Sequence, residues 1–552
     1  MLSNKIYRYF VLLSVFIGGS FLLSAQNNEI PKLNMGMNLD SYSYYTRSLL
    51  FVDVMKSASD MMTFNAQGES PWNTEKINKI KRDPQGYPLE LPVAVDNGPP
   101  QAVRFLINNV YSGDYVFLYD GEGEFDFSLP NSKDKGKIIL HLDGKGDNRW
   151  INIKKSQKGN HVRNIRILPA DDSFDPKLPF YPLYVEGIAQ FHCLRFMDLL
   201  GTNGSNVTTW ETRVQPDYYS QGTDKGVAIE YAIQLSNQLK CDAWFCIPHK
   251  ADDQYIHKFA QLVHDTLDPN LKVYIEYSNE IWNWQFGQAH YVLENAPGAI
   301  DQYVSDKLKG ISPKQENHPE KDAYMMQRVF RIWSDVFGDS QKQRLVRVAA
   351  VQHAWVDNTK RILQYLFKFD ENGKPLSGPI YKDSEGHGCD VVAPGGYFSY
   401  SDADKNKWQK MDPSQVTPEV ILKGVDKSYS KEAGAWTLDT AKYARTWKVG
   451  YVVYEGGQHI TPFDQKDTPY NQAIWDAQIN PMMYDLYMKL FRTHASPEVD
   501  CKLFCAFAYV SERKSRWGSW GHLERLDQLH NLSNIKLIAP KFAAVIDANI
   551  QR

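Results

Sequence analysis

The sequence has few cysteines, almost no net charge and only one long apolar run. Six cysteines in 552 residues are too few for a disulfide framework. No Cys-x-x-Cys or His-x-x-x-His spacing indicates a metal site, so neither a metal nor another cofactor is expected. The formal net charge of −3 offers no basic surface for nucleic acid or an anionic membrane.

The one long apolar run lies at the N-terminus. Lys5 and Arg8 precede apolar residues 10–23, which end at Ser24-Ala25-Gln26. This order is typical of a signal peptide and predicts one over residues 1–25. The run is shorter than the roughly 20 residues of a comfortable membrane span, although an uncleaved anchor helix is the alternative. We therefore expect an exported protein, periplasmic, cell-surface or secreted, with no membrane span after cleavage.

Aromatic residues are abundant, with 14 Trp, 32 Tyr and 26 Phe. A large core accounts for most of them, because 43% of all residues are hydrophobic. The alternative is a sugar-binding cleft, since flat aromatic rings fit the apolar faces of sugars.

Residues 61–178 have a different pattern from the rest of the chain. Apolar runs at 115–119, 137–142, 150–153 and 162–168 alternate in polarity and are separated by turns such as Asp120-Gly and Asp143-Gly. Alternation with Asp-Gly turns is typical of antiparallel strands. The segment is predicted to be an inserted β-rich, sandwich-like domain that helps to bind polysaccharide.

Strands and helices alternate through the remaining chain, which predicts a parallel sheet. The expected strands are 33–39, 193–199, 243–248, 273–278, 345–351, 390–394, 449–454 and 503–509. The expected helices are 47–58, 226–239, 255–266, 323–337, 360–369, 438–446 and 482–493. Eight such units predict a (β/α)₈ TIM barrel, an α/β fold, with its first unit at 30–60 and the remainder at 179–552. An open doubly wound sheet is the alternative, but its Gly-x-Gly-x-x-Gly fingerprint is absent.

Two carboxylates follow apolar strands of this predicted barrel. Glu280 follows the fourth strand and Glu455 follows the seventh. Catalytic groups of TIM barrels lie at the carboxyl ends of the strands. Glycoside hydrolysis needs one protonated carboxyl group and one carboxylate on either side of the scissile bond. The pair is therefore the candidate catalytic centre.

The segment Glu276-Tyr-Ser-Asn279-Glu280 resembles the Glu-x-x-Asn-Glu signature at the fourth strand of clan A glycoside hydrolases. Tyr454-Glu455-Gly-Gly resembles the nucleophile segment of that clan at strand seven. The tract 194–284 also resembles secreted bacterial proteins of unassigned substrate that carry a Glu-Tyr-Ser-Asn-Glu-x-Trp-Asn motif. The resemblance covers the barrel but not the inserted domain.

The resemblance implies roles for particular residues. Glu280 would be the acid/base and Glu455 the nucleophile of a retaining enzyme, with carboxyl groups about 5–5.5 Å apart. Asn279 would bind the sugar 2-hydroxyl, and Arg195 and Tyr397 would orient Glu455 in its ionised form. The further substrate-binding candidates are Asp40, His249, Trp282, Trp284, His353 and Trp517.

Three positions differ from the pattern of the clan. Ile281 replaces a proline, Tyr454 replaces a small residue, and Tyr509 stands where a tryptophan usually ends the eighth strand. Trp517 or Trp520 is expected to supply the missing ring. By strand alternation Glu276 lies deeper in the barrel than Glu280, as a buried structural acid paired with a base.

The expected function is hydrolysis of a β-linked polysaccharide or oligosaccharide, with endo action. Two alternatives remain at this stage. The first is a carbohydrate-binding protein whose barrel has lost catalysis, and the second is a hydrolase or lyase that acts on an acidic polysaccharide. The basic residues Arg513, Lys514 and Arg516 motivate the second.

Overall fold

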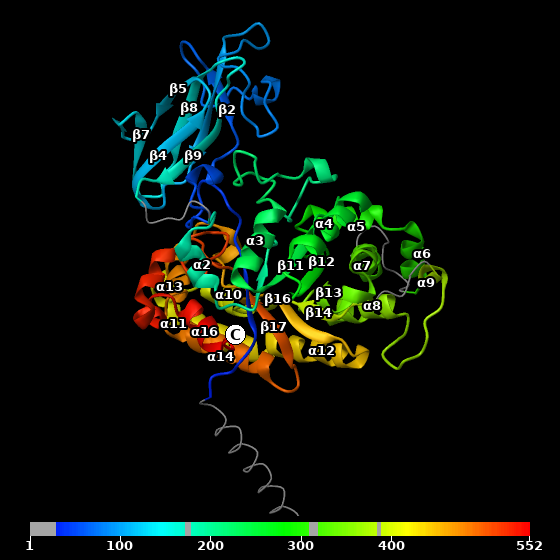
Figure 1. Ribbon diagram of the computed structural model, residues 1–552. Helices are drawn as coiled ribbons and strands as arrows, with labels where there is room; N and C mark the ends of the chain where they lie inside the picture. Colours follow the sequence, from blue (N-terminus) through cyan, green and yellow to red (C-terminus); the bar gives the residue numbers. More distant parts are fainter. Residues whose placement is uncertain (1–28, 172–177, 308–317, 383–387) are drawn as a thin grey trace, which may run out of the picture.

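The computed structural model describes residues 29–171, 178–307, 318–382 and 388–552 (Figure 1). The predicted signal peptide, residues 1–25, lies outside this part of the chain. Within the described ranges, no helix combines the length and apolar character that a membrane crossing requires.

Eight parallel strands close into a barrel, as predicted. The order is β1-β10-β11-β12-β13-β14-β16-β17, and pairing of β17 with β1 and of β14 with β16 completes the ring. The sixth strand is split, since β15 follows β14 after one residue and pairs with the far end of β16. The bounds are β1 (Met35–Asn38), β10 (Cys193–Arg195), β11 (Asp242–Ile247), β12 (Val273–Tyr277), β13 (Leu345–Val351), β14 (Val391–Pro394), β15 (Gly396–Phe398), β16 (Gly450–Gln458) and β17 (Cys501–Ala506).

The helices pack around this ring because the strands are buried on both faces, as parallel strands of α/β proteins are. The α-helices are α2 (Pro182–Ile188), α3 (Ile229–Leu239), α4 (Asp253–Thr266), α5 (Gly287–Asn295), α6 (Gly298–Lys307), α7 (Pro319–Gln341), α8 (Val356–Phe367), α9 (Pro379–Lys382), α10 (Asp402–Trp408), α11 (Pro418–Lys431), α12 (Ala433–Trp447), α13 (Asn471–Ala477), α14 (Met482–Ala495), α15 (Ile535–Ile538) and α16 (Pro540–Ala548). Short 3₁₀ helices are η1 (Val54–Ser57), η2 (Ile77–Lys79), η3 (Trp210–Thr212), η4 (Lys342–Arg344), η5 (Pro413–Gln415), η6 (Phe463–Gln465) and η7 (Leu526–Asn534).

The segment between β1 and β10 contains two antiparallel sheets. We call these two sheets, together with the loops that join their strands, the insert. One sheet has the order β2 (Met62–Asn65), β3 (Gln101–Ile107), β8 (Arg149–Ser156) and β5 (Gly123–Phe127). The other has the order β6 (Asn131–Asp134), β7 (Lys137–Asp143), β4 (Ser112–Asp120) and β9 (Arg163–Pro169). The sheets enclose a core of their own, separate from that of the barrel. In Figure 1 the insert stands above the barrel, and the described chain enters from below.

The helix expected at residues 47–58 is wrong. Only η1 is helical there, and the preceding residues pair with the start of the barrel's second unit. Val52 donates to the carbonyl of Pro179, while Asp53 accepts from the backbone of Ile167 in β9. The apolar residues at helical spacing in this segment do not form one face of a helix. Some of them pack in the core of the insert and others in the core of the barrel.

Candidate active site

Arg195, the last residue of β10, is the centre of a hydrogen-bonded network at the mouth of the barrel. Its buried guanidinium donates to both carboxylate oxygens of Glu276 at 2.9 to 3.1 Å. It also donates to Glu455 at 3.1 Å, to Asn38 at 3.0 Å and to Asn279 at 2.8 Å. A guanidinium presents five N–H donors in a fixed fork, so one side chain orients groups from three parts of the barrel.

Glu276 on β12 is the deeper of the two carboxylates that Arg195 binds. It is 1% exposed and also accepts from the indole nitrogen of Trp244 at 2.8 Å. Burial raises the pKa of Glu276, and the Arg195 guanidinium opposes that shift. The prediction of a buried structural acid paired with a base is confirmed.

Arg195 also binds Glu455 on β16, which lies nearer to the mouth of the barrel than Glu276 does. Glu455 is 5% exposed, and the Tyr397 side chain lies close enough to stabilise its charged form. Burial, and then the negative charge of Glu280, raise the pKa of Glu455 well above its usual range. Arg195 and Tyr397 lower that pKa, so these two contacts favour the ionised form.

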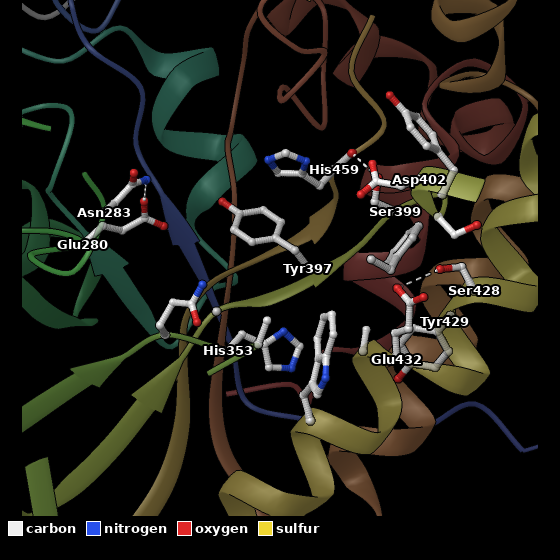
Figure 2. Close-up of a pocket in the computed structure, with 18 of the residues that line it drawn as sticks. Glu280, Asn283, His353, Tyr397, Ser399, Asp402, Ser428, Tyr429, Glu432 and His459 are labelled. Atoms are coloured by element: carbon white, nitrogen blue, oxygen red, sulfur yellow. Dashed lines mark hydrogen bonds between the residues drawn. The ribbon is translucent and has the colours of Figure 1, made fainter. Parts of the chain in front are cut away.

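Glu280 lies in the turn after β12 and reaches into open space (Figure 2). Its backbone has a φ of 43°, in the left-handed region that costs a non-glycine residue about 1–3 kcal/mol and is found at functional sites. One carboxylate oxygen accepts from Asn283 at 2.8 Å and the other from the Tyr454 hydroxyl at 2.9 Å. The carboxyl group is thus held in one orientation, with no basic side chain bonded to it.

Tyr454 and Glu455 are consecutive residues, yet the side chains of both lie at the mouth of the barrel. Successive residues of a regular strand point to opposite faces. The pairing of β16 with β17 shifts register between Val453 and Gly456, and such irregularities redirect side chains near active sites. The departure at position 454 therefore gives Glu280 a hydrogen-bond donor.

For the hydrolysis that the sequence predicts, Tyr454→Phe should lower kcat/KM about 10- to 150-fold. A hydrogen bond to a charged group contributes about 1.5–3 kcal/mol, and each 1.4 kcal/mol is a tenfold rate change. Initial-rate kinetics measure the effect, and Tyr443→Phe on α12, remote from the two glutamates, is the matched control. Equal rates in both variants would contradict a positioning role for the Tyr454 hydroxyl.

A cavity of about 700 Å³, which we call the first cavity, opens beside Glu280 (Figure 2). The structure brings four predicted residues to its lining, namely Trp282, Trp284, His353 and Tyr397. The sequence analysis missed Asn283, Trp436 and His459, which also line it. Trp436 comes from α12, far along the chain, and no local pattern marks it as a site residue.

A second cavity of about 290 Å³ is lined by Asp40, Asp198 and Trp517 among others. Burial raises the pKa of Asp40 to about 7, partly offset by a hydrogen bond from the Val510 amide at 2.7 Å. Burial also raises the pKa of Asp198 to about 6, and Arg195 opposes that shift. Two carboxyl groups, which are hydrogen-bond acceptors when ionised, thus face the second cavity.

We predict that Asp40→Asn stabilises the protein at pH 8 by about 1–3 kcal/mol, allowing for partial solvent access. The folded pKa of about 7 lies above the ordinary 3.8, so the folded state binds this proton more tightly than the unfolded chain. Stability from this group is full below pH 3.8 and is lost as pH rises toward 7. Thermal melts at pH 4 and pH 8 should show a difference only at pH 8, and a lower melting temperature there would contradict the assignment.

Four predicted site residues line neither cavity. Arg195, Asn279 and Glu455 are joined by hydrogen bonds, whereas His249 lies outside that network. His249 is 1% exposed, and its ring packs against Tyr291 at 5.2 Å between centroids. Burial lowers its pKa to about 4. Asn279, by contrast, lies in the Arg195 network, and its amide nitrogen donates to Asn203 at 3.1 Å.

The eighth strand ends earlier than expected, which changes the residue at the mouth. Tyr509 is buried and donates to the carbonyl of Tyr184, away from the cavities. Phe507 and Trp520 take its place, with ring centroids 6.4 and 6.0 Å from that of Tyr397. Trp517, which the sequence predicts to bind substrate, also lines the second cavity.

All six cysteines lie in the described residues, where they are buried and free. Across the same ranges, no group of three or more His, Cys, Asp or Glu side chains is arranged to hold a metal ion.

No family model and no curated protein sequence matches the chain. Among solved structures, it is similar to the GH51 arabinofuranosidase from Xanthomonas axonopodis pv. citri, at 12% identity, TM-score 0.33 and 62% coverage of both chains. A family 51 alpha-L-arabinofuranosidase from Bifidobacterium longum has 13% identity and TM-score 0.33, covering 62% of this chain and 64% of its own. The native xylanase10C from Cellvibrio japonicus has 9% identity and TM-score 0.31, covering 88% and 97%. The chain thus spans less than two thirds of the two arabinofuranosidases.

Proposed function

We propose that the protein is a retaining glycoside hydrolase that cleaves a β-linked polysaccharide. The observation that carries the proposal is the contrast between two carboxyl groups at one mouth. Glu455 is buried and bonded to Arg195, whereas Glu280 faces the first cavity and is bonded only to neutral donors. One group suited to be an anion and one suited to exchange a proton are the requirement of this reaction.

In the first step, a carboxylate oxygen of Glu455 attacks the anomeric carbon of the sugar. The glycosidic C–O bond breaks, and its oxygen takes the proton of Glu280 as the leaving group departs. The Arg195 guanidinium opposes the rise in the pKa of Glu455 and so favours the attacking carboxylate, and Asn279 binds the 2-hydroxyl.

In the second step, Glu280 is a carboxylate and removes a proton from water. The hydroxide oxygen attacks the anomeric carbon, the bond to Glu455 breaks, and the sugar leaves with its original configuration. This order requires about 5–5.5 Å between the carboxyl groups, because an inverting enzyme leaves room for a water molecule at 6.5–9.5 Å.

Action within a polymer is supported by space on both sides of the glutamate pair. The first cavity adjoins Glu280 and the second adjoins the residues around Glu455. A chain that continues in both directions therefore has room on either side of the scissile bond. The predicted signal peptide supports export of the protein. Polysaccharides of this kind are found outside the cytoplasm.

The proposal is tested by incubating the purified protein with plant, fungal and algal polysaccharides and measuring new reducing ends. We expect hydrolysis of at least one β-linked polymer, with products whose first-formed anomer keeps the substrate's configuration by proton NMR. Inversion would contradict the assigned mechanism. An unsaturated product absorbing in the ultraviolet would indicate a lyase, and binding without cleavage would indicate a carbohydrate-binding protein.

A further inference from the structure

A third cavity of about 490 Å³ lies at the junction of the barrel and the insert. Barrel residues Ser41, Tyr45 and Asp198 line both this cavity and the second one. The insert contributes Met62 on β2, and Trp72 from the loop that follows it. The two cavities are thus adjacent, and the insert contributes to the lining of the third.

Trp72 is presented as a fixed aromatic surface. The guanidinium carbon of Arg104 lies 4.4 Å from the centroid of the Trp72 ring and 4.3 Å from that of Phe64. The surrounding loop is anchored where Thr74 donates to Gln101 at 2.6 Å. The indole is nevertheless 48% exposed, so a cation packs against part of the ring while the remainder faces solvent.

Among the described residues, the most exposed aromatic side chains lie at the three cavities. The most exposed large aromatic side chains of the described residues are Tyr45 at 65%, Trp517 at 57%, Trp72 at 48% and Trp284 at 39%. Each of them lines the first, second or third cavity. Exposing an indole or phenol ring to water is unfavourable, so a common location along one path indicates a shared ligand with apolar faces.

The charge along the second and third cavities is negative. Five carboxyl groups line them, and the one basic side chain in these linings, Arg47, is paired with Glu512 at 2.7 Å. The five are Asp40, Asp60, Asp198, Asp224 and Glu512. Carboxylates accept hydrogen bonds from sugar hydroxyls but repel sulfate and uronate groups.

The two sides of the scissile bond can be told apart. The proton donor Glu280 opens to the first cavity, so the leaving part of the substrate lies there. Phe507, which lines the second cavity, donates its amide to the carbonyl of Gly456, the residue after the nucleophile Glu455, at 2.9 Å. The glycone part of the substrate therefore lies in the second cavity and continues into the third.

We infer that the insert supplies a distal glycone subsite, in which Trp72 and Tyr45 stack on units of an uncharged polysaccharide that extends from the catalytic glutamates. The inference rests on the proposed function for the position of the scissile bond. It selects neutral polymers over the acidic polysaccharides that the sequence left open. The insert is then part of the substrate path.

The test measures binding separately from turnover. Affinity gel electrophoresis of the full chain, in a Glu455→Gln background, uses hydroxyethylcellulose, glucomannan, xylan and mixed-linkage β-glucan as neutral polymers and alginate as the acidic one. We expect retardation by at least one neutral polymer and none by alginate. Trp72→Ala should weaken that retardation about tenfold, and Trp72→Phe should retain most of it.

Leu89→Ala, at another exposed apolar residue of the insert, is the matched control and should bind like its parent. Unchanged binding by Trp72→Ala, stronger retardation by alginate, or no retardation by any neutral polymer would overturn the inference. Melting curves of each variant separate a lost subsite from a misfolded insert. Absence of hydrolysis by the wild type, with Trp72-dependent binding intact, would instead contradict only the proposed function.

Discussion

The Glu455→Gln variant will hydrolyse polysaccharide at least about 10⁴-fold more slowly than the wild type, because removing a nucleophile abolishes the covalent route. Its affinity for the same polymer should stay within about threefold. The amide is nearly isosteric and can still accept a hydrogen bond from Arg195. Reducing-end assays give the rate, and affinity electrophoresis gives the binding.

The stability of this variant separates a catalytic role from a structural one. Burial and the charge of Glu280 disfavour the ionised form of Glu455, so a neutral amide should melt at the same or a higher temperature at pH 7. Glu294→Gln, on the exposed side of α5, is the matched control and should retain full activity. Wild-type turnover in Glu455→Gln would refute the assignment of the nucleophile.

The Glu280→Ala variant will lose about 10²–10⁴-fold of its activity on polysaccharide, the usual contribution of a general acid. The loss should be much smaller in the first step with a dinitrophenyl glycoside, since that leaving group departs without a proton. Azide should restore turnover and give a glycosyl azide of retained configuration, because the empty space at position 280 admits a small anion. Product NMR identifies the azide.

Two outcomes would contradict this role for Glu280. An equal loss on polysaccharide and on the dinitrophenyl glycoside would show that the residue does not donate the proton. A glycosyl azide of inverted configuration would show that azide had replaced the nucleophile, and Glu280 would then be the nucleophile rather than the acid/base. Glu294→Gln again reports any effect of azide on an intact site.

The strand order of the barrel was predictable because short apolar runs alternate with helical segments along the chain. The residues at which each strand begins and ends were harder to predict. β16 extends past the expected end to Gln458 because β15 pairs with it there, a contact between distant segments. β17 stops at Ala506, so Phe507 rather than Tyr509 reaches the mouth. The polarity pattern of a single strand contains neither fact.

The sequence located the two glutamates, since each follows a strongly apolar strand, but not what holds them. The donation from Tyr454 to Glu280 depends on a shift of register in β16, which polarity does not reveal. His249 occupies a strand end as expected, yet its side chain is buried against Tyr291. Position at a strand end predicts proximity to a site, and packing decides whether a side chain enters it.

The adjacency of Tyr454 and Glu455 in β16 has a mechanical consequence. Glu280 is bonded to one residue and the nucleophile is the next, so a single peptide unit spans the two catalytic groups. The separation of the two carboxyl groups thus depends on one hydrogen bond and the Tyr454 side chain as well as on the covalent chain, and a motion of the turn that carries Glu280 has to stretch or break that bond to change it.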